Sequence, residues 1–206
     1  MTWMLTSTGA TVDLRFMRHE DISVLDIAHH LAQTNRYTGA CSRPYSVAEH
    51  SLLVCEIVER VQCERNPSIL LAALMHDAHE AYTQDLSQPM KQIIGQAWET
   101  EEQRIAHSVH KRFGLVTAFI VARKQIHDAD LTALSTERAQ LLPPGGPAWP
   151  VTQSHPPIGW WRFSEREAFT WQDWRQAFLD RFAELHFARK LHAESLGNSP
   201  TTEDHQ

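Results

Sequence analysis

The chain has 206 residues, of which 42% are hydrophobic and 21% charged, with a formal net charge of −6. This length suits one domain with a substantial core, and the composition is that of an ordinary globular protein. The acidic balance without long Lys/Arg runs argues against a DNA- or RNA-binding surface. No apolar run reaches the roughly 20 residues of a membrane helix, and no signal-peptide pattern opens the chain. We therefore expect a cytoplasmic protein with no membrane partner, whose three cysteines are reduced.

The elements predicted along the chain are almost all helical. An alternating stretch at 11–16 suggests a short strand or hairpin in an N-terminal arm. Periodic apolar residues, cap residues and Pro/Gly breaks then predict helices over 23–32, 46–61, 67–80, 96–113, 117–142 and 164–195. The predicted fold class is all-α. The chain is expected to form a single domain over 1–206. This domain has a core at about 20–142, a Pro-rich loop at 143–163, a C-terminal helix at 164–195 and a short β-like arm.

Particular residues mark the ends and inner faces of these helices. Asp21 or Ser23 can cap the first helix, and Ser46 with Glu49 three residues later forms a capping-box pattern. Apolar spacing places Val47, Val54, Ile57, Val58 and Val61 inside the second helix, Phe119, Ile120 and Ile126 inside the fifth, and Phe169, Trp174, Phe178 and Phe182 inside the last.

The tryptophans are more numerous than a core of this size requires, with seven in the chain. Trp160, Trp161, Trp171 and Trp174 are expected to pack in the core rather than to stack on a nucleobase. Trp149, within the Pro-rich loop, is a candidate lid over a pocket.

The residues that indicate chemistry begin at the end of an apolar helix. Leu70–Met75 is followed at once by His76, Asp77, His79 and Glu80. Burying such groups is costly unless they are paired, hydrogen-bonded or bound to a metal. This stretch therefore predicts a bound ligand. We interpret it as part of a metal site, whose remaining ligands should come from other parts of the chain.

Two other helices offer further ligands. His50 lies on the same helical face as Val54 and Ile57, although a single inward histidine is more often a hydrogen-bonded core residue. Asp130 and Asp128 differ by about 200° around their helix, so only one can point inward, and the apolar neighbours favour Asp130. Two imidazoles and two carboxylates suit a borderline or hard divalent ion with open positions, and without thiolates a structural zinc site is disfavoured.

These residues and their surroundings resemble one known family. His50, the adjacent pair His76-Asp77 and the distant Asp130 are similar to the H…HD…D signature of the HD-domain phosphohydrolases. The segments 45–51, 76–80 with Asp85-Leu86 and Pro89-x-Lys91, and 129–131 with Thr136-Glu137, look like motifs of its bacterial 5′-deoxynucleotidase branch. The resemblance covers about residues 25–142, and phage deoxynucleoside triphosphate triphosphohydrolases of the same fold share these motifs.

The resemblance implies a role for each matching residue. His50, His76, Asp77 and Asp130 would hold a divalent ion (Mn²⁺, Co²⁺, Mg²⁺, Zn²⁺ or Fe²⁺). Asp77 and Glu80 would be catalytic, with Glu80 working on the attacking water or the leaving group, and the i,i+4 spacing from His76 would put Glu80 on the ligand face.

Substrate contacts carry over in the same way. Arg36 would contact the substrate phosphate, Asp85 the sugar 3′-hydroxyl, and Tyr37 stands where the family carries a tryptophan that excludes a 2′-hydroxyl. Lys91 and His79 are further candidates, with His79 expected to be peripheral. Each has a plainer interpretation as a solvated charge, a salt bridge or a turn residue. Gln84 replaces a family glycine beside Asp85, so the sugar pocket is expected to differ.

The function expected from this pattern is a metal-dependent phosphoric ester hydrolase acting on a small nucleotide. A 5′-(deoxy)nucleotidase releasing phosphate from (d)NMPs, through attack by metal-bound water, is the leading hypothesis. A dNTP triphosphohydrolase releasing deoxynucleoside and triphosphate is the alternative, and a non-catalytic nucleotide sensor is a hypothesis of another class. Relatives of this fold assemble as dimers or larger rings, so a homo-oligomer is expected.

Overall fold

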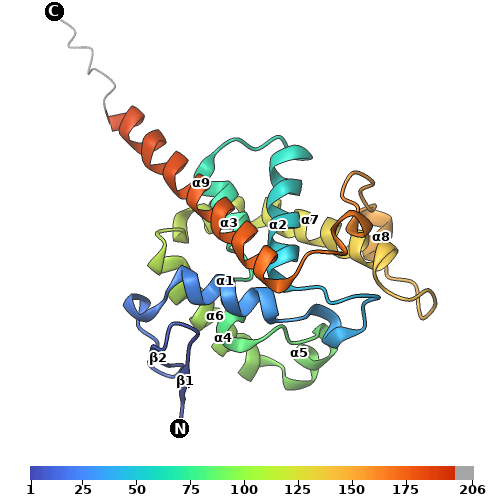
Figure 1. Ribbon diagram of the computed structural model, residues 1–206, viewed down its shortest axis with the longest axis horizontal. Helices are drawn as coiled ribbons and strands as arrows, with labels where there is room; N and C mark the ends of the chain where they lie inside the picture. Colours follow the sequence, from blue (N-terminus) through green and yellow to red (C-terminus); the bar gives the residue numbers. More distant parts are fainter. Residues whose placement is uncertain (198–206) are drawn as a thin grey trace, which may run out of the picture.

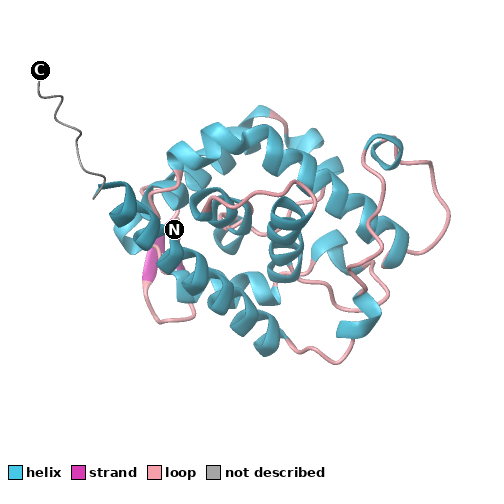
Figure 2. Ribbon diagram, turned by 90° about the horizontal axis from the view of Figure 1, so that it is seen from above, coloured by secondary structure: helices cyan, strands magenta, loops and turns pink. Residues whose placement is uncertain are grey.

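Helices make up most of the computed structural model, which describes residues 1–197 (Figures 1 and 2). The predicted all-α class with a short β arm is confirmed at this level. The predicted domain boundary at 206 lies outside the described residues. The helices are α1 (Val24–Gln33), α2 (Val47–Arg60), α3 (Pro67–Leu74), α4 (Glu80–Thr83), α5 (Gln88–Ile94), α6 (Gln96–Arg112), α7 (Val116–Gln140), α8 (Val151–Ser154) and α9 (Trp171–Gly197), with 3₁₀ turns at His19–Asp21, Arg36–Gly39 and Phe163–Arg166.

The N-terminal arm is an antiparallel hairpin of β1 (Trp3–Leu5) and β2 (Thr11–Asp13), in which Met4 lies opposite Val12. Its turn is attached to α1, because the Asp26 carboxylate accepts hydrogen bonds from the Ser7 hydroxyl at 2.6 Å and the Thr8 amide at 2.8 Å. The Thr8 hydroxyl also donates to Asp26, at 2.9 Å, so three donors on one buried carboxylate hold this small hairpin in place.

The first two helices begin where their cap residues predict. The Ser23 hydroxyl accepts from the Leu25 amide, and the Ser46 hydroxyl accepts from the Glu49 amide. The other half of the predicted capping box is wrong, because the Glu49 carboxylate is buried and forms an ion pair with Arg43 at 2.7 Å. Val61 was expected inside, but α2 ends at Arg60 and Val61 is 51% exposed.

The predicted helix over 67–80 is wrong in its second half. Asn66 caps α3 and Pro67 occupies its first turn, as expected, but the helix ends at Leu74. Residues 75–79 form turns in which the amides of Ala78 and Glu80 bond to carbonyls three residues earlier rather than four. The polar sequence at this point therefore does not continue the apolar helix, and the premise that helical spacing aligns Glu80 with His76 fails.

Other boundaries also differ from the predictions. α5 and α8 lie in stretches expected to be loop, and α9 begins at Trp171 rather than at 164. Phe169 precedes α9 and is 47% exposed, and Ile120 on α7 is 72% exposed, so both were wrongly assigned to the core. Of the four tryptophans expected in the core, Trp161 and Trp174 are buried, whereas Trp160 and Trp171 are more than a third exposed.

The packing of the helices determines where the site lies. α2 packs against α3 and α7, and α9 crosses α1 and α3 before its last turns project from the body of the protein (Figure 1). α4 is linked to α1 by the His30 ring, whose Nδ1 lies 2.8 Å from the Ala81 carbonyl oxygen. Three elements, α2, the turn after α3 and α7, thereby meet in the interior with their polar residues facing one another.

Within residues 1–197, no helix has both the length and the apolar character needed to cross a membrane.

Candidate metal centre

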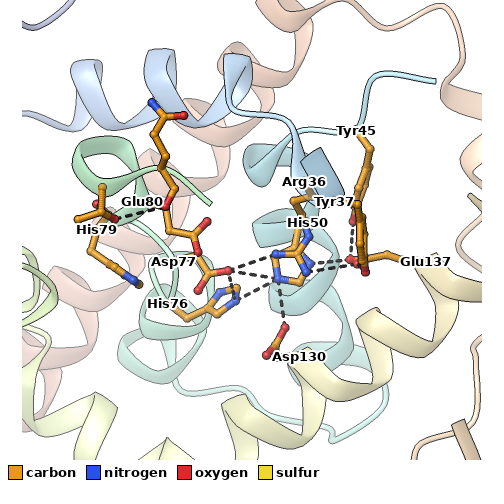
Figure 3. Close-up of polar contacts among 12 residues, drawn as sticks. Arg36, Tyr37, Tyr45, His50, His76, Asp77, His79, Glu80, Asp130 and Glu137 are labelled. Atoms are coloured by element: carbon orange, nitrogen blue, oxygen red, sulfur yellow. Dashed lines mark hydrogen bonds and ion pairs between the residues drawn. The ribbon is translucent and has the colours of Figure 1, made fainter. Parts of the chain in front are cut away.

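The four ligands expected from the sequence come together at one point (Figure 3). Nε2 of His50, on α2, lies 3.2 Å from Nε2 of His76, 3.2 Å from Oδ1 of Asp130 and 3.4 Å from Oδ2 of Asp77. Nε2 of His76 lies 3.1 Å from the same Asp77 oxygen. Ligand atoms about 2.1 Å from a shared ion stand roughly 3.0–3.4 Å apart at octahedral or tetrahedral angles. His50, His76 and Asp130 therefore have the spacing to hold one divalent ion, since one ligand atom of each lies within 4.8 Å of the other two. Asp77 contacts both imidazoles but does not belong to that group of three.

The hydrogen bonds of the two imidazoles support this fit. His50 Nδ1 lies 2.6 Å from Oε1 of Glu137, and His76 Nδ1 lies 2.9 Å from the Ala73 carbonyl oxygen. Both partners accept hydrogen bonds, so each Nδ1 carries a proton, and in the neutral form of each ring the Nε2 lone pair faces the other ligand-type side chains. Two lone pairs and two carboxylates facing one another repel unless a cation lies between them, and this donor set suits a divalent metal.

Of the two aspartates of α7, Asp130 is the one that lies beside the imidazoles. The Asp128 carboxylate pairs with Lys124 at 2.5 Å and lies 3.6 Å from Nε2 of His155, and it makes no contact with His50 or His76. The side chain of Asp130 is 35% exposed, whereas that of His50 is fully buried. The centre is therefore rigid on the side of α2 and open on the side of α7.

Glu137 is a site residue that the sequence did not assign to any role. It is fully buried on α7, and its two oxygens accept hydrogen bonds from His50, from the Tyr45 hydroxyl at 2.7 Å and from the Tyr37 hydroxyl, with Arg36 at 3.3 Å. Burial alone would raise the pKa of Glu137, but the charges of Arg36 and His50 outweigh it and hold the pKa well below its usual range. A carboxylate behind a ligating histidine fixes the tautomer and orientation of the ring. In the sequence, Glu137 could have been found from its position two helical turns after Asp130, which puts both residues on the same face of the helix.

Arg36 and Tyr37 lie beside the centre, in a strained turn. The Arg36 guanidinium is 3.6 Å from Oδ2 of Asp77 and is almost completely buried, so it contacts both a ligand and Glu137. Tyr37 and Thr38 have φ values of 56° and 51°, in the left-handed region that non-glycine residues rarely adopt. The Tyr37 ring also lies 6.4 Å from that of Trp149, which brings the Pro-rich loop to the edge of the site.

Glu80 and Asp85 form the acidic side of the site. Glu80 begins α4, is 3% exposed and has an oxygen, Oε2, without a hydrogen-bond partner. Burial, followed by the charges of Asp77 and Asp85, raises the pKa of Glu80 well above its usual value. Burial also raises the pKa of Asp85, which the positive charge of Arg36 opposes. A carboxyl group with a raised pKa beside a cluster of ligands can carry a proton at neutral pH.

His79 and Lys91 lie on the far side of Glu80 from the centre. His79 is 8% exposed and Nε2 lies 3.5 Å from Oε1 of Glu102, while the Lys91 ammonium is 2.6 Å from the same oxygen and 4.0 Å from Oε1 of Glu80. Neither residue contacts the four ligands, which agrees with the peripheral position expected for His79. Glu102, on α6, was not singled out from the sequence.

A cavity of about 710 Å³ opens onto the exposed side of the centre. His76 and Asp130 line its inner end, and residues of the first half of α7 form its wall: Phe119, Ile120, Val121, Arg123, Lys124, Ile126 and His127. A volume of this size accommodates a small organic molecule. The wall is mixed, since most of its side chains are apolar but Arg123 and Lys124 are cationic, and it leads to His76 and Asp130.

Comparisons with known proteins show relatives but no described activity. No protein-family model matches the chain. The chain is 32% identical over 156 residues to "Uncharacterized protein YfdR" of Escherichia coli (strain K12), which covers 76% of this chain and 82% of the relative. It is 38% identical over 146 residues to "Uncharacterized protein RCAP_rcc00048" of Rhodobacter capsulatus, covering 68% of this chain and 72% of the relative. The matches extend over most of each protein, so the similarity is one of whole chains rather than of a short motif.

Proposed function

This chain belongs to the same family as YfdR of Escherichia coli, and we propose that it is a divalent-metal-dependent phosphohydrolase of the HD-domain type, acting on nucleotides. The reaction that we assign to it is that of a 5′-(deoxy)nucleotidase, which releases phosphate from a (d)NMP. The observation that carries the proposal is the convergence of His50, His76, Asp77 and Asp130 from three separate elements, with lone pairs facing one point.

A divalent ion held by these four side chains would lower the pKa of a water molecule and polarise a phosphoryl oxygen. The chain itself supplies orientation and proton transfer. Glu137 holds the His50 ring in the tautomer that leaves Nε2 free. Open positions on the side of Asp130 face the cavity, where a substrate can approach.

Arg36 is suited to bind the phosphate of a substrate. Its guanidinium is held within 3.6 Å of both Asp77 and Glu137, and its Nε has no hydrogen-bond partner. A phosphate arriving at the centre can share this buried cation with the two carboxylates. Asp85, half-buried within the field of Arg36, is the group we assign to a sugar hydroxyl.

Glu80 is suited to move the proton. Burial and two neighbouring carboxylates raise its pKa, so the protonated form can donate to the nucleoside oxygen as the phosphate ester bond breaks. This assignment rests on the side chain's position next to Asp77 in the turn region, and not on the helical alignment that the sequence suggested.

The test is product analysis. Purified protein with Mn²⁺ or Co²⁺ is incubated with dNMP, dNTP and rNMP series, and nucleosides, phosphate and triphosphate are separated by chromatography. We expect nucleoside and phosphate from monophosphates. The proposal fails if metal is bound at the four ligands but no nucleotide in the panel is hydrolysed, a result that would leave the nucleotide sensor as the remaining hypothesis.

A dNTP triphosphohydrolase is a second candidate, supported by the cavity. A longer phosphate chain needs cations beyond Arg36, but Arg43 is paired with Glu49 and Lys91 with Glu102. The cavity wall offers Arg123 and Lys124 instead. Release of intact triphosphate from a dNTP, at a rate that falls on Arg123→Ala, would favour this candidate over the monophosphatase.

A further inference from the structure

A second group of ligand-type side chains lies beside the candidate metal centre. His79 and Glu80 come from the start of α4, and Glu102 comes from the middle of α6. One nitrogen or oxygen from each lies within 4.8 Å of the corresponding atoms of the other two. The group shares no residue with the four ligands already described.

Polar atoms in this group lack partners although they are buried. His79 is 8% exposed and neither of its ring nitrogens makes a hydrogen bond, and Oε2 of Glu80, which is 3% exposed, makes none either. The 3.5 Å approach of His79 Nε2 to Glu102 is too poorly aligned to count as one. Leaving several buried polar atoms unpaired in one place costs free energy, so such atoms call for a ligand.

One positively charged side chain, that of Lys91, already contacts this group. The Lys91 ammonium lies 2.6 Å from Oε1 of Glu102 and 4.0 Å from Oε1 of Glu80. The Lys91 ammonium is at the end of a long, flexible side chain on α5, so the ammonium can move away toward solvent. It leaves both His79 nitrogens and Oε2 of Glu80 unsatisfied, because an ammonium donates hydrogen bonds along only a few directions.

From these contacts we propose that His79, Glu80 and Glu102 form a second divalent-cation site, for which Lys91 is the competing cation. One imidazole and two carboxylates favour Mn²⁺, Co²⁺ or Zn²⁺ over Ca²⁺ or Mg²⁺, which prefer oxygen ligands alone. A site with three protein ligands leaves positions for water or a substrate oxygen. An ion bound here would keep Glu80 deprotonated. Occupancy of the second site would therefore decide whether Glu80 can donate a proton at the first centre.

The site can be tested by metal stoichiometry without any activity assay. The full chain is stripped with a chelator and titrated with Mn²⁺, and free Mn²⁺ is followed by electron paramagnetic resonance. Lys91→Met removes the competing ammonium while keeping the length of the side chain, and Glu102→Gln removes a ligand. Glu101→Gln is the matched control, because Glu101 is the adjacent residue on α6 but is exposed and paired with Arg104.

We expect the Lys91→Met protein to bind two Mn²⁺ per chain, the second with a Kd lower than in the unsubstituted protein by about tenfold or more, as expected when a close like charge is removed. Glu102→Gln should lose the second ion, and Glu101→Gln should not. In Asp130→Asn the first ion should be weakened and the second retained, which separates this proposal from the first centre. A single Mn²⁺ per chain in Lys91→Met, or a second ion that Glu102→Gln leaves unchanged, would overturn the proposal.

Discussion

The two sides of the candidate centre differ in how completely their buried polar atoms are satisfied. Around Glu137, four side chains from three parts of the chain share the two carboxylate oxygens. Around Glu80, one carboxylate oxygen and both nitrogens of His79 have no hydrogen-bond partner, and neither does Nε2 of nearby His110. Both sides are equally buried, so burial does not explain the difference.

This difference in hydrogen bonding indicates that the two sides of the centre have different roles. Both oxygens of the Glu137 carboxylate are hydrogen-bonded, which holds this side chain in one arrangement and suits a residue that orients a metal ligand. Unsatisfied buried groups are costly and persist where a ligand or a proton is to be received. We infer that Glu137 orients the His50 ring, and that Glu80 and its unsatisfied neighbours receive a proton or a second cation.

The largest effect is expected where the two sides meet, at the ligands. Asp130→Asn should weaken tight Mn²⁺ binding and turnover by about a hundredfold or more, since it removes a ligand rather than an outer partner, whose loss typically costs 10- to 100-fold. Asp128→Asn is the matched control two residues away, because Asp128 pairs with Lys124 and makes no contact with His50 or His76. Calorimetric titration and a turnover assay measure both quantities. A loss confined to Asp128→Asn would mean that the ligand has been misassigned.

On the unsatisfied side, Glu80→Gln should lower kcat by about 10²- to 10⁴-fold, the contribution typical of a general acid or base. Tight Mn²⁺ binding at the four ligands should be unchanged, because Glu80 is not among them. The measurement is steady-state kinetics at a Mn²⁺ concentration that fills only the tight site. An unchanged kcat would show that Glu80 does not move the proton.

On the satisfied side, Glu137→Gln should weaken Mn²⁺ binding by about 10- to 100-fold and lower the free energy of unfolding by about 3 kcal/mol. Glu49→Gln is the control, since Glu49 is another fully buried carboxylate with an arginine partner but does not contact a ligand. Both variants should be destabilised in urea titrations, and only Glu137→Gln should lose metal affinity. Equal losses of affinity would mean that Glu137 acts through general stability alone.

The sequence predicted the parts of this site that depend on residue type and failed where backbone geometry decides. His50 and Asp130 could be placed because apolar neighbours at helical spacing mark the inner face. The turn at 75–79 could not be predicted, because its residues also suit a helix. The change there from i→i−4 to i→i−3 hydrogen bonds depends on tertiary packing. The importance of Glu137 and Glu102 depends on contacts between distant segments, such as that of Glu137 with Tyr45, 92 positions away in the chain.

The smallest expected effect concerns pH and the third unsatisfied group, His110 on α6. Its ring stacks on Phe119 with 3.6 Å between centroids. Burial, aided by the charges of His79 and His107, lowers the pKa of His110 from 6.5 to about 3. The unfolded chain therefore binds this proton first, so stability is complete above pH 6.5 and falls as the pH decreases toward 3, by at most about 1.4 kcal/mol per pH unit.

His110→Phe keeps a stacked ring that cannot be protonated, and it should remove this part of the pH dependence. Urea midpoints at pH 7, 5.5 and 4.5 would measure it as the difference between the unsubstituted chain and the variant, which cancels the titration of all other groups. His192→Gln, exposed on α9 and not among the groups that shift the pKa of His110, is the control and should leave the slope unchanged. Parallel pH profiles for His110→Phe and the unsubstituted chain would show that the His110 ring is charged in the folded protein, and that this side of the centre is better solvated than its unsatisfied atoms indicate.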